Sequence, residues 1–156
     1  MNKKDILTFF ATLGPVGYSP MAPGTAGTVV SAVIVYLLRP SDVAIGVGCF
    51  FLFFLGVMAS TRAEQTLGES DSSHIVVDEA VAFPIALLFN NINMLTVIMA
   101  FFLFRFFDIV KPFPIKKIEA KLHRGLAVMT DDLVAAIYSN ITLHIVLYLI
   151  NLFRAN

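Results

Sequence analysis

The segment 104–115 reads Phe104-Arg105-Phe106-Phe107-Asp108-Ile109-Val110-Lys111-Pro112-Phe113-Pro114-Ile115. It follows an almost wholly apolar run that begins at Met94. Arg105, Asp108 and Lys111 recur at a spacing of three, and residues three apart lie on one face of a helix. The two prolines should end this helix, because proline lacks the amide N–H and clashes with the preceding turn. The segment therefore predicts an apolar helix ending in a charged stripe, which is either a functional site or a salt-bridge stripe that ends a membrane helix.

The composition of the chain is typical of an integral membrane protein. Of its 156 residues, 58% are apolar and 14% are charged, whereas soluble domains have roughly 45–50% and about 25%. The mean hydropathy is +0.82. The formal net charge is zero, which gives no argument for nucleic acid as a partner. The length suits one domain over residues 1–156, and the single cysteine, Cys49, cannot form an intrachain disulfide.

The apolar runs predict an all-α fold, a compact bundle of about four to six helices integral to the membrane. In the first half we expect a short amphipathic helix at 5–13, a Gly- and Pro-rich loop at 14–28 that Thr25 or Thr28 closes as N-cap, and a helix at 29–38. A longer helix is expected at 43–60, capped by Ser41 or Asp42. Its glycines should let another helix pack closely, namely Gly46, Gly48 and Gly56.

In the second half, 80–89 and 94–107 predict a helical hairpin, partly re-entrant, that turns at an Asn cluster and is bent by Pro84. The segment 111–124 predicts a basic amphipathic surface helix, and 133–153 predicts a last span. A soluble bundle with a very apolar core stays open, because 29–38 and 80–89 are short for spans.

The distribution of basic residues predicts the orientation in the membrane. Cytoplasmic loops carry an excess of Lys and Arg, so 111–124 and the pair Lys3-Lys4 should lie inside. Tracing the helices from there places the loop at 14–28, the acidic stretch at 64–79 and the charged stripe at the cytoplasmic face. Nearly all the chemistry-bearing residues therefore share one side.

Three acidic clusters stand where polar sequence meets an apolar helix: Asp78-Glu79, Asp108 and Asp131-Asp132. If they converge, the carboxylates repel each other, and a divalent cation such as Mg²⁺ resolves this because it prefers carboxylate oxygens and also binds phosphate. Arg105 and Lys111 could then neutralise a phosphate. For any single acid, helix N-capping is the simpler explanation. Three clusters beside a basic stripe favour a metal–phosphate site.

The chain resembles the phosphatidylglycerophosphatase A family. The matching pieces occur in the family's order between about residues 13 and 136. They are Ser19-Pro20-Met21-Ala22-Pro23-Gly24-Thr25-Ala26-Gly27-Thr28, then Asp71 with Ile75-Val76-Val77-Asp78-Glu79, then Phe104-Arg105 with Phe107-Asp108 and Lys111-Pro112-Phe113-Pro114-Ile115, then Gly125 with Met129 and Asp131-Asp132. The family usually has a glycine where Ala82 stands, and tends to have a Gly-Gly-x-Gly run where this chain reads Arg124-Gly125-Leu126-Ala127.

The resemblance implies a Mg²⁺-dependent phosphatase that converts phosphatidylglycerophosphate to phosphatidylglycerol in phospholipid synthesis. It implies an enzyme of bacterial membranes. Together with the apolar runs and the basic segments, this predicts a multi-pass protein of the bacterial cytoplasmic (inner) membrane, with its site facing the cytoplasm. The expected catalytic and metal-binding residues are Asp78, Glu79, Asp108, Asp131 and Asp132, with Asp71 as a further metal ligand. The expected substrate-binding residues are Ser19, Gly24, Thr25, Arg105 and Lys111, with backbone N–H groups around Gly24 and Thr25.

Two other functions remain open on the sequence. A small ion or proton carrier would have acids throughout the membrane depth, whereas mid-span acids are missing here. A phosphatase of another phosphomonoester would keep the same acids and cations. Of the histidines, His74 is expected in a loop near the site, and His144 is expected to be hydrogen-bonded within the bundle.

Overall fold

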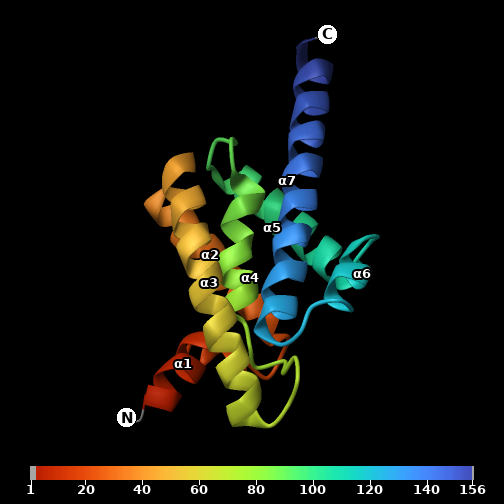
Figure 1. The fold of residues 1–156 in the computed structure, drawn as a ribbon. Coiled ribbons are helices and arrows are strands. Elements are labelled where there is room, and N and C mark those ends of the chain that lie inside the picture. Colours follow the sequence, from red (N-terminus) through yellow and green to blue (C-terminus); the bar gives the residue numbers. More distant parts are fainter. Residues whose placement is uncertain (1–2, 156) are drawn as a thin grey trace.

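A computed structural model describes residues 3–155. Within that range the chain forms seven α-helices and two 3₁₀ helices, with no strand, which confirms the all-α prediction (Figure 1). The elements are α1 (Lys3–Ala11), η1 (Val16–Tyr18), α2 (Pro23–Leu38), α3 (Asp42–Leu67), α4 (Val77–Ala82), η2 (Phe83–Leu87), α5 (Met94–Val110), α6 (Ile115–Glu119) and α7 (Gly125–Ala155). The helices outnumber the four to six expected because α4 and α6 are short pieces of six and five residues.

Helix α2 begins six residues before the position predicted from the sequence. Its first residue is Pro23, and proline suits the first helical position because no intrahelical partner awaits its missing N–H. Ala22 is the N-cap and makes no side-chain capping bond. The prediction that Thr25 or Thr28 caps this helix is therefore wrong: both lie inside it, and the Thr28 hydroxyl donates to the Gly24 carbonyl at 2.9 Å.

The two longest helices, α3 and α7, also extend beyond their predicted bounds. The Ser41 hydroxyl caps α3 by accepting from the Ala44 amide at 3.3 Å, as predicted, but the helix continues to Leu67 before Gly68 ends it in a left-handed conformation. Helix α7 begins at Gly125 rather than near residue 133, so Asp131 and Asp132 lie within a helix. These two acids are not helix caps.

Close packing of α3 against α7 occurs at one end only. An added Cβ at Gly125 would lie 2.4 Å from the Val57 carbonyl oxygen, and one at Gly56 would lie 2.6 Å from the Met129 side chain. A Cβ at Gly46 or Gly48 would meet nothing within 4 Å. The prediction of close helix packing is therefore right for Gly56 and wrong for the other two.

The predicted hairpin is formed by α4 and η2 on one arm and by α5 on the other. The α-helix gives way to the 3₁₀ helix η2 next to Pro84, which agrees with the predicted bend. The Asn93 side chain caps α5 by accepting from the Thr96 amide at 3.1 Å. His144 of α7 supports the turn, because its Nε2 lies 3.1 Å from both Asn90 Nδ2 and the Leu88 carbonyl oxygen. The prediction for His144 is confirmed.

The basic segment 111–124 is not one surface helix, which corrects the prediction. Its only α-helix is α6, of five residues. Proline cannot occupy a helix interior, so Pro112 and Pro114 confine the helix to the residues after them. Arg124, which precedes α7, has a φ of 54° and so lies outside regular helical geometry.

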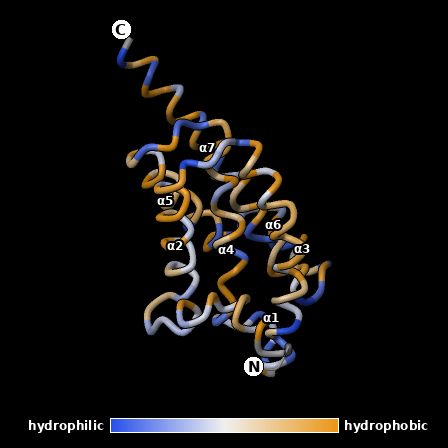
Figure 2. Tube along the Cα trace, turned by 90° about the vertical axis from the view of Figure 1, so that its left-hand side faces the viewer, coloured by the Kyte–Doolittle hydropathy of each residue, from blue (hydrophilic) through white to orange (hydrophobic). Residues whose placement is uncertain are grey.

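The apolar side chains of α3 and α7 largely face outward. Both helices are long and apolar enough to cross a membrane, over Asp42–Leu67 and Gly125–Arg154. Only 28% and 22% of their most apolar 18-residue windows are buried, so most of this apolar surface does not serve a protein core. Figure 2 shows hydrophobic stretches running along these helices. The two termini lie at opposite ends of the molecule (Figure 1).

Candidate active site

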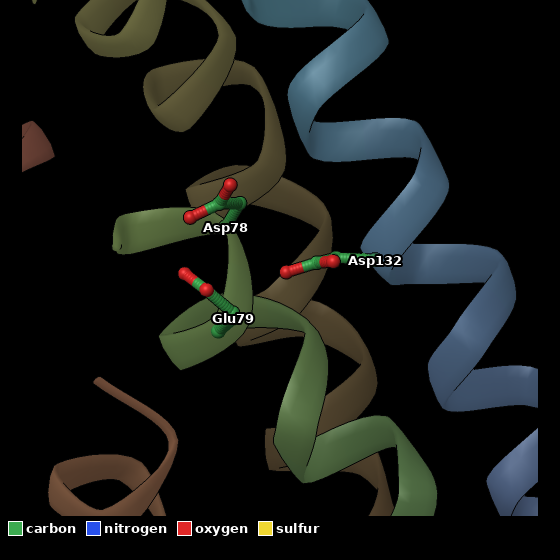
Figure 3. A group of neighbouring side chains, drawn as sticks. All are labelled: Asp78, Glu79 and Asp132. Atoms are coloured by element: carbon green, nitrogen blue, oxygen red, sulfur yellow. The ribbon is translucent and has the colours of Figure 1, made fainter. Parts of the chain in front are cut away.

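Three buried carboxylates from two helices converge inside the bundle. Asp78 and Glu79 stand in the first turn of α4, and Asp132 stands on α7. Each offers an oxygen, and these oxygens all lie within 4.8 Å of one another. Figure 3 shows the three side chains around a common space. We call Asp78, Glu79 and Asp132 the carboxylate cluster.

The chain ahead of α4 is held so that the first turn of this helix faces inward. The Val76 amide donates to the Ala11 carbonyl at the end of α1 (3.0 Å). Helix α2 crosses at close range, because a Cβ at Gly27 would lie 2.9 Å from the Val76 carbonyl oxygen. A Cβ at Gly24 would lie only 1.8 Å from Glu79 Oε1. The glycines of the Pro-Gly-Thr segment thus allow the start of α2 to lie against Glu79.

Burial makes the cluster electrostatically unfavourable when it is fully ionised. Burial raises the pKa of Asp78 well above its ordinary value, and the neighbouring charge of Glu79 raises it further. The pKa of Glu79 is also raised by burial, although a hydrogen bond from Asp78 and the charge of Arg105 partly offset this rise. The cluster is therefore short of positive charge.

The cluster also has unsatisfied oxygens. Asp78 Oδ1, Glu79 Oε2 and Asp132 Oδ2 are buried and have no hydrogen-bond partner among the described residues. Buried polar atoms normally have partners, so each exception needs an explanation. A divalent cation with oxygen ligands fits both the missing positive charge and the missing partners.

Arg105 links the cluster to the charged stripe on α5. Its Nη1 lies 2.8 Å from Asp108 Oδ2, 3.5 Å from Glu79 Oε1 and 3.5 Å from the Thr28 hydroxyl. Its Nε is buried and has no hydrogen-bond partner among the described residues. Arg105 therefore keeps one buried donor for a further acceptor.

Lys111 forms the second cation–carboxylate contact of the site. It is the C-cap of α5, in a left-handed conformation, and its Nζ lies 2.5 Å from Asp131 Oδ2. The structure thus brings together the acids of all three predicted clusters, from α4, α5 and α7, with both predicted cations. Asp131 is joined to the stripe by Lys111, and Asp108 is joined to Glu79 by Arg105.

Asp71 lies outside the carboxylate cluster. It is exposed, and its amide donates to Glu64 Oε1 at 2.9 Å. It lines a cavity of about 220 Å³ that is shared with Asp131 and Arg124. Asp71 is thus a neighbour of Asp131.

The other predicted substrate-binding residues lie around the start of α2. The Ser19 hydroxyl donates to the Met21 carbonyl at 3.3 Å, just before the helix. Gly24 and Thr25 are in its first turn, where backbone N–H groups lack intrahelical partners. Gly24 lies against Glu79 and Arg105. The first turn of α2 therefore adjoins the cluster.

Two residues near the site were not predicted to belong to it from the sequence: Thr28 was considered only as a helix cap, and Glu64 was not singled out. Thr28 contacts Arg105, and Glu64 is buried and holds the Asp71 amide. Both contacts join segments whose approach depends on helix packing, so no local spacing indicates them. His74, predicted as a loop residue, lies before α4, where its Nδ1 contacts the Gly17 carbonyl oxygen at 2.8 Å.

A helical bundle that holds buried carboxylates beside an arginine has the features of an enzyme acting on phosphate esters. The sequence model of the phosphatidylglycerophosphatase A family matches residues 9–147. The chain belongs to this family of phosphatases, and the resemblance stated from the motifs is confirmed.

Three similar proteins have curated names. A Bacteroides thetaiotaomicron protein, named provisionally as a phosphatidylinositol-3-phosphatase, is 40% identical over 86% of this chain and 89% of its own length. The phosphatidylglycerophosphatase A of Haemophilus influenzae is 36% identical over 81% of this chain and 80% of its own length. The phosphatidylglycerophosphatase A of Escherichia coli is 31% identical over 79% of this chain and 73% of its own length. No solved structure shows a significant match to the chain.

Proposed function

We propose that the chain is a Mg²⁺-dependent lipid phosphatase that hydrolyses phosphatidylglycerophosphate to phosphatidylglycerol and phosphate in phospholipid synthesis. The observation that carries the proposal is a set of three buried carboxylate oxygens beside the buried Nε of Arg105, all four atoms lacking a hydrogen-bond partner within residues 3–155. The names of the Haemophilus and Escherichia relatives support this substrate. The name of the Bacteroides relative supports a second candidate, a phosphatidylinositol phosphomonoester.

We place the protein in the bacterial cytoplasmic membrane as one multi-pass domain over residues 1–156, with the hairpin of α4, η2 and α5 partly re-entrant. The outward-facing apolar surfaces of α3 and α7 support a membrane location. The basic segment 111–124 follows the charged stripe directly and precedes Asp131. By the positive-inside rule this puts the site at the cytoplasmic face.

The carboxylate cluster would hold Mg²⁺, with Asp108, Asp131 and the neighbouring Asp71 completing the proposed set. When bound, Mg²⁺ supplies positive charge that stabilises phosphoryl oxygens and lowers the pKa of bound water. One carboxylate of this set would orient the attacking water or accept its proton.

The phosphate would be held by groups that surround the cluster. Arg105 would donate from its buried Nε, and the backbone N–H groups of Gly24 and Thr25 would add donors from the first turn of α2, where Gly24 lies against Glu79 and Arg105. Lys111 adds charge next to Asp131, and Ser19 lies just before α2. A lipid phosphomonoester would present its phosphate here at head-group level while its acyl chains stay in the bilayer.

The test is phosphate release in mixed micelles from phosphatidylglycerophosphate and, in parallel, from phosphatidylinositol 3-phosphate. Each substrate is assayed with Mg²⁺ or EDTA for the native chain, Asp108→Asn and the exposed control Glu69→Gln. We expect Mg²⁺-dependent release from phosphatidylglycerophosphate that Asp108→Asn abolishes and Glu69→Gln preserves. Phosphate release from the inositol lipid alone would show that the proposed substrate is wrong. Full activity in EDTA would show that the proposed Mg²⁺ dependence is wrong.

A further inference from the structure

We propose that an apolar groove between α3, η2 and α7 binds an acyl chain of the lipid whose phosphate lies at the carboxylate cluster. This inference rests on the proposed function. The groove has a volume of about 390 Å³, within the range of roughly 300–1,000 Å³ that is usual for ligand pockets. Its walls include Gly46 and Phe53 of α3, Val81 and Ile85 from the hairpin, and Met129 and Leu133 of α7.

The groove adjoins the carboxylate cluster on two helices. On α4, Val81 follows Asp78 by three residues, so the two side chains lie on the same face. On α7, Met129 precedes Asp132 by three residues and shares its face in the same way. A ligand in the groove therefore lies next to a group bound at the cluster.

The lining of the groove selects hydrocarbon. It is almost wholly apolar, and the one thiol in it, that of Cys49, donates to the Val81 carbonyl at 3.3 Å. A polar ligand would lose its hydrogen bonds with water and gain none here. A ligand with an anionic phosphate and an adjoining hydrocarbon chain matches the cluster and the groove together.

The dimensions and the opening of the groove suit a chain in one leaflet. Its α3 wall runs from Gly46 to Phe54, about 12 Å at the rise of an α-helix. One leaflet contributes about 15 Å of hydrocarbon, half of a ~30 Å core. Phe50 and Phe54 line the groove and are more than half exposed, so it is open laterally, where a chain from the surrounding bilayer can enter.

A second apolar groove, of about 450 Å³, is lined by α2 and α5 only, with Val33 and Phe101 among its residues. Neither of these helices carries a member of the carboxylate cluster. The groove along α3 is favoured because α4 and α7, which carry the three carboxylates, also contribute residues to its lining.

Two glycines of α3 provide a matched test. A Cβ at Gly46 would meet nothing within 4 Å, and Gly46 lines the groove, so a larger side chain there has room to extend into it. Gly48 has equally open surroundings but does not line the groove. Gly46→Leu and Gly48→Leu therefore add the same volume to the same helix, inside and outside the groove.

Both variants are assayed for kcat/KM with dioleoyl and dihexanoyl phosphatidylglycerophosphate in the same detergent. We expect Gly46→Leu to lower kcat/KM for the dioleoyl lipid at least roughly tenfold, the effect of about one misfitted methylene, and to change kcat/KM for the dihexanoyl lipid less than about twofold. Gly48→Leu should leave both values unchanged. If the two variants changed kcat/KM equally, or if Gly46→Leu changed it equally for the two lipids, the proposal that the groove binds an acyl chain would be wrong.

A binding measurement tests whether the groove holds an acyl chain even if the proposed phosphatase activity is not found. If the native chain releases no phosphate, the substrate assignment fails, but the groove can still be tested because the chain contains no tryptophan. Phe53→Trp puts a single indole in the groove, and Phe51→Trp puts one on the exposed face of the same helix. Each is titrated in micelles with phosphatidic acid that carries brominated acyl chains.

We expect quenching of the Phe53→Trp variant to saturate near one lipid per protein. The Phe51→Trp variant should be quenched only in proportion to the bulk lipid. If both variants are quenched in proportion to bulk lipid, the groove is ordinary lipid-facing surface and the proposal is wrong.

Discussion

The Glu79 carboxylate occupies space that any side chain at Gly24 would need. A Cβ at Gly24 would lie 1.8 Å from Glu79 Oε1 and 3.4 Å from Arg105 Nη1. Glu79 cannot simply swing aside, because it is buried and its Oε1 also faces Arg105 at 3.5 Å. A backbone position on α2 therefore controls the location of a carboxylate on α4.

We expect Gly24→Ala to displace Glu79 and weaken the proposed metal site. Overpacking of this kind costs about 1–3 kcal/mol of folding free energy, and disturbing the support of a ligand lowers metal affinity about 10–100-fold. The measurement is a Mg²⁺ titration followed by thermal unfolding in detergent. The control is Gly48→Ala, whose added methyl meets nothing within 4 Å. Unchanged Mg²⁺ affinity in Gly24→Ala would refute the steric argument.

Arg105→Lys should lower kcat/KM about a hundredfold despite keeping the charge. Arg105 faces Asp108, Glu79 and Thr28 through one nitrogen and leaves Nε as a separate buried donor, an arrangement that an ammonium group does not reproduce. The loss of one preorganised donor of this kind costs about 10²–10³-fold. The assay is steady-state phosphate release, with Arg62→Lys as control at a half-buried arginine that contacts Gln65 and lies outside the site. Near-native activity of the Arg105→Lys variant would show that charge alone is required.

The metal-free protein should become less stable as the pH rises. The pKa values of Asp78 and Glu79 are raised in the folded state, so the folded chain binds more protons than the unfolded chain between the ordinary and the raised values. Over that window, which begins at about pH 4, the free energy of unfolding falls with increasing pH. Thermal unfolding in EDTA across the window measures the slope.

Saturating Mg²⁺ should remove this slope, because metal-bound carboxylates carry no proton and, like those of the unfolded chain, take none up over this window. Asp78→Asn removes one of the titrating groups and should flatten the slope measured in EDTA. A metal-free protein whose stability does not change with pH would contradict the assignment of these two carboxyl groups.

Asp132→Asn should abolish stabilisation by Mg²⁺. A ligand at a hundred times its Kd stabilises the folded state by about 2.7 kcal/mol, and Asp132 supplies one of the three converging oxygens. The measurement is the shift of the unfolding temperature between EDTA and saturating Mg²⁺, with Glu69→Gln as the control that keeps the shift. The same shift in both variants would place the metal elsewhere.

Much of the site follows from periodicity in the sequence. Arg105 and Asp108 are one helical turn apart, and the structure pairs them at 2.8 Å. The acids of 78–79 and 131–132 stand beside long apolar runs, and a bundle of such runs brings their ends together. The helical fold is equally visible in these runs.

The predicted helix bounds are wrong where packing between helices overrides the local preferences of glycine and proline. The glycines and prolines of 14–28 favoured a loop, but Gly24 and Gly27 are inside α2 because that helix must approach α4 closely. Helix α7 starts at Gly125, whose amide donates to the Thr61 hydroxyl of α3 at 3.2 Å, a contact that no local pattern indicates. The position of Asp71 depends likewise on its contact with Glu64, across the turn after α3.

The contacts of Gly56 and Gly125 join α3 to α7 at one end, while the open surroundings of Gly46 and Gly48 let the two helices diverge toward the other end, as Figure 1 shows. The two helices thus form a V, with the carboxylate cluster near the end where they touch and the groove in the space where they separate. The tip of α3 is tied to the hairpin turn, because Asp42 Oδ1 accepts from the Phe89 amide at 2.8 Å. In the proposed membrane setting, a change in bilayer thickness would therefore act first on the C-terminal turns of α7, far from the carboxylate cluster.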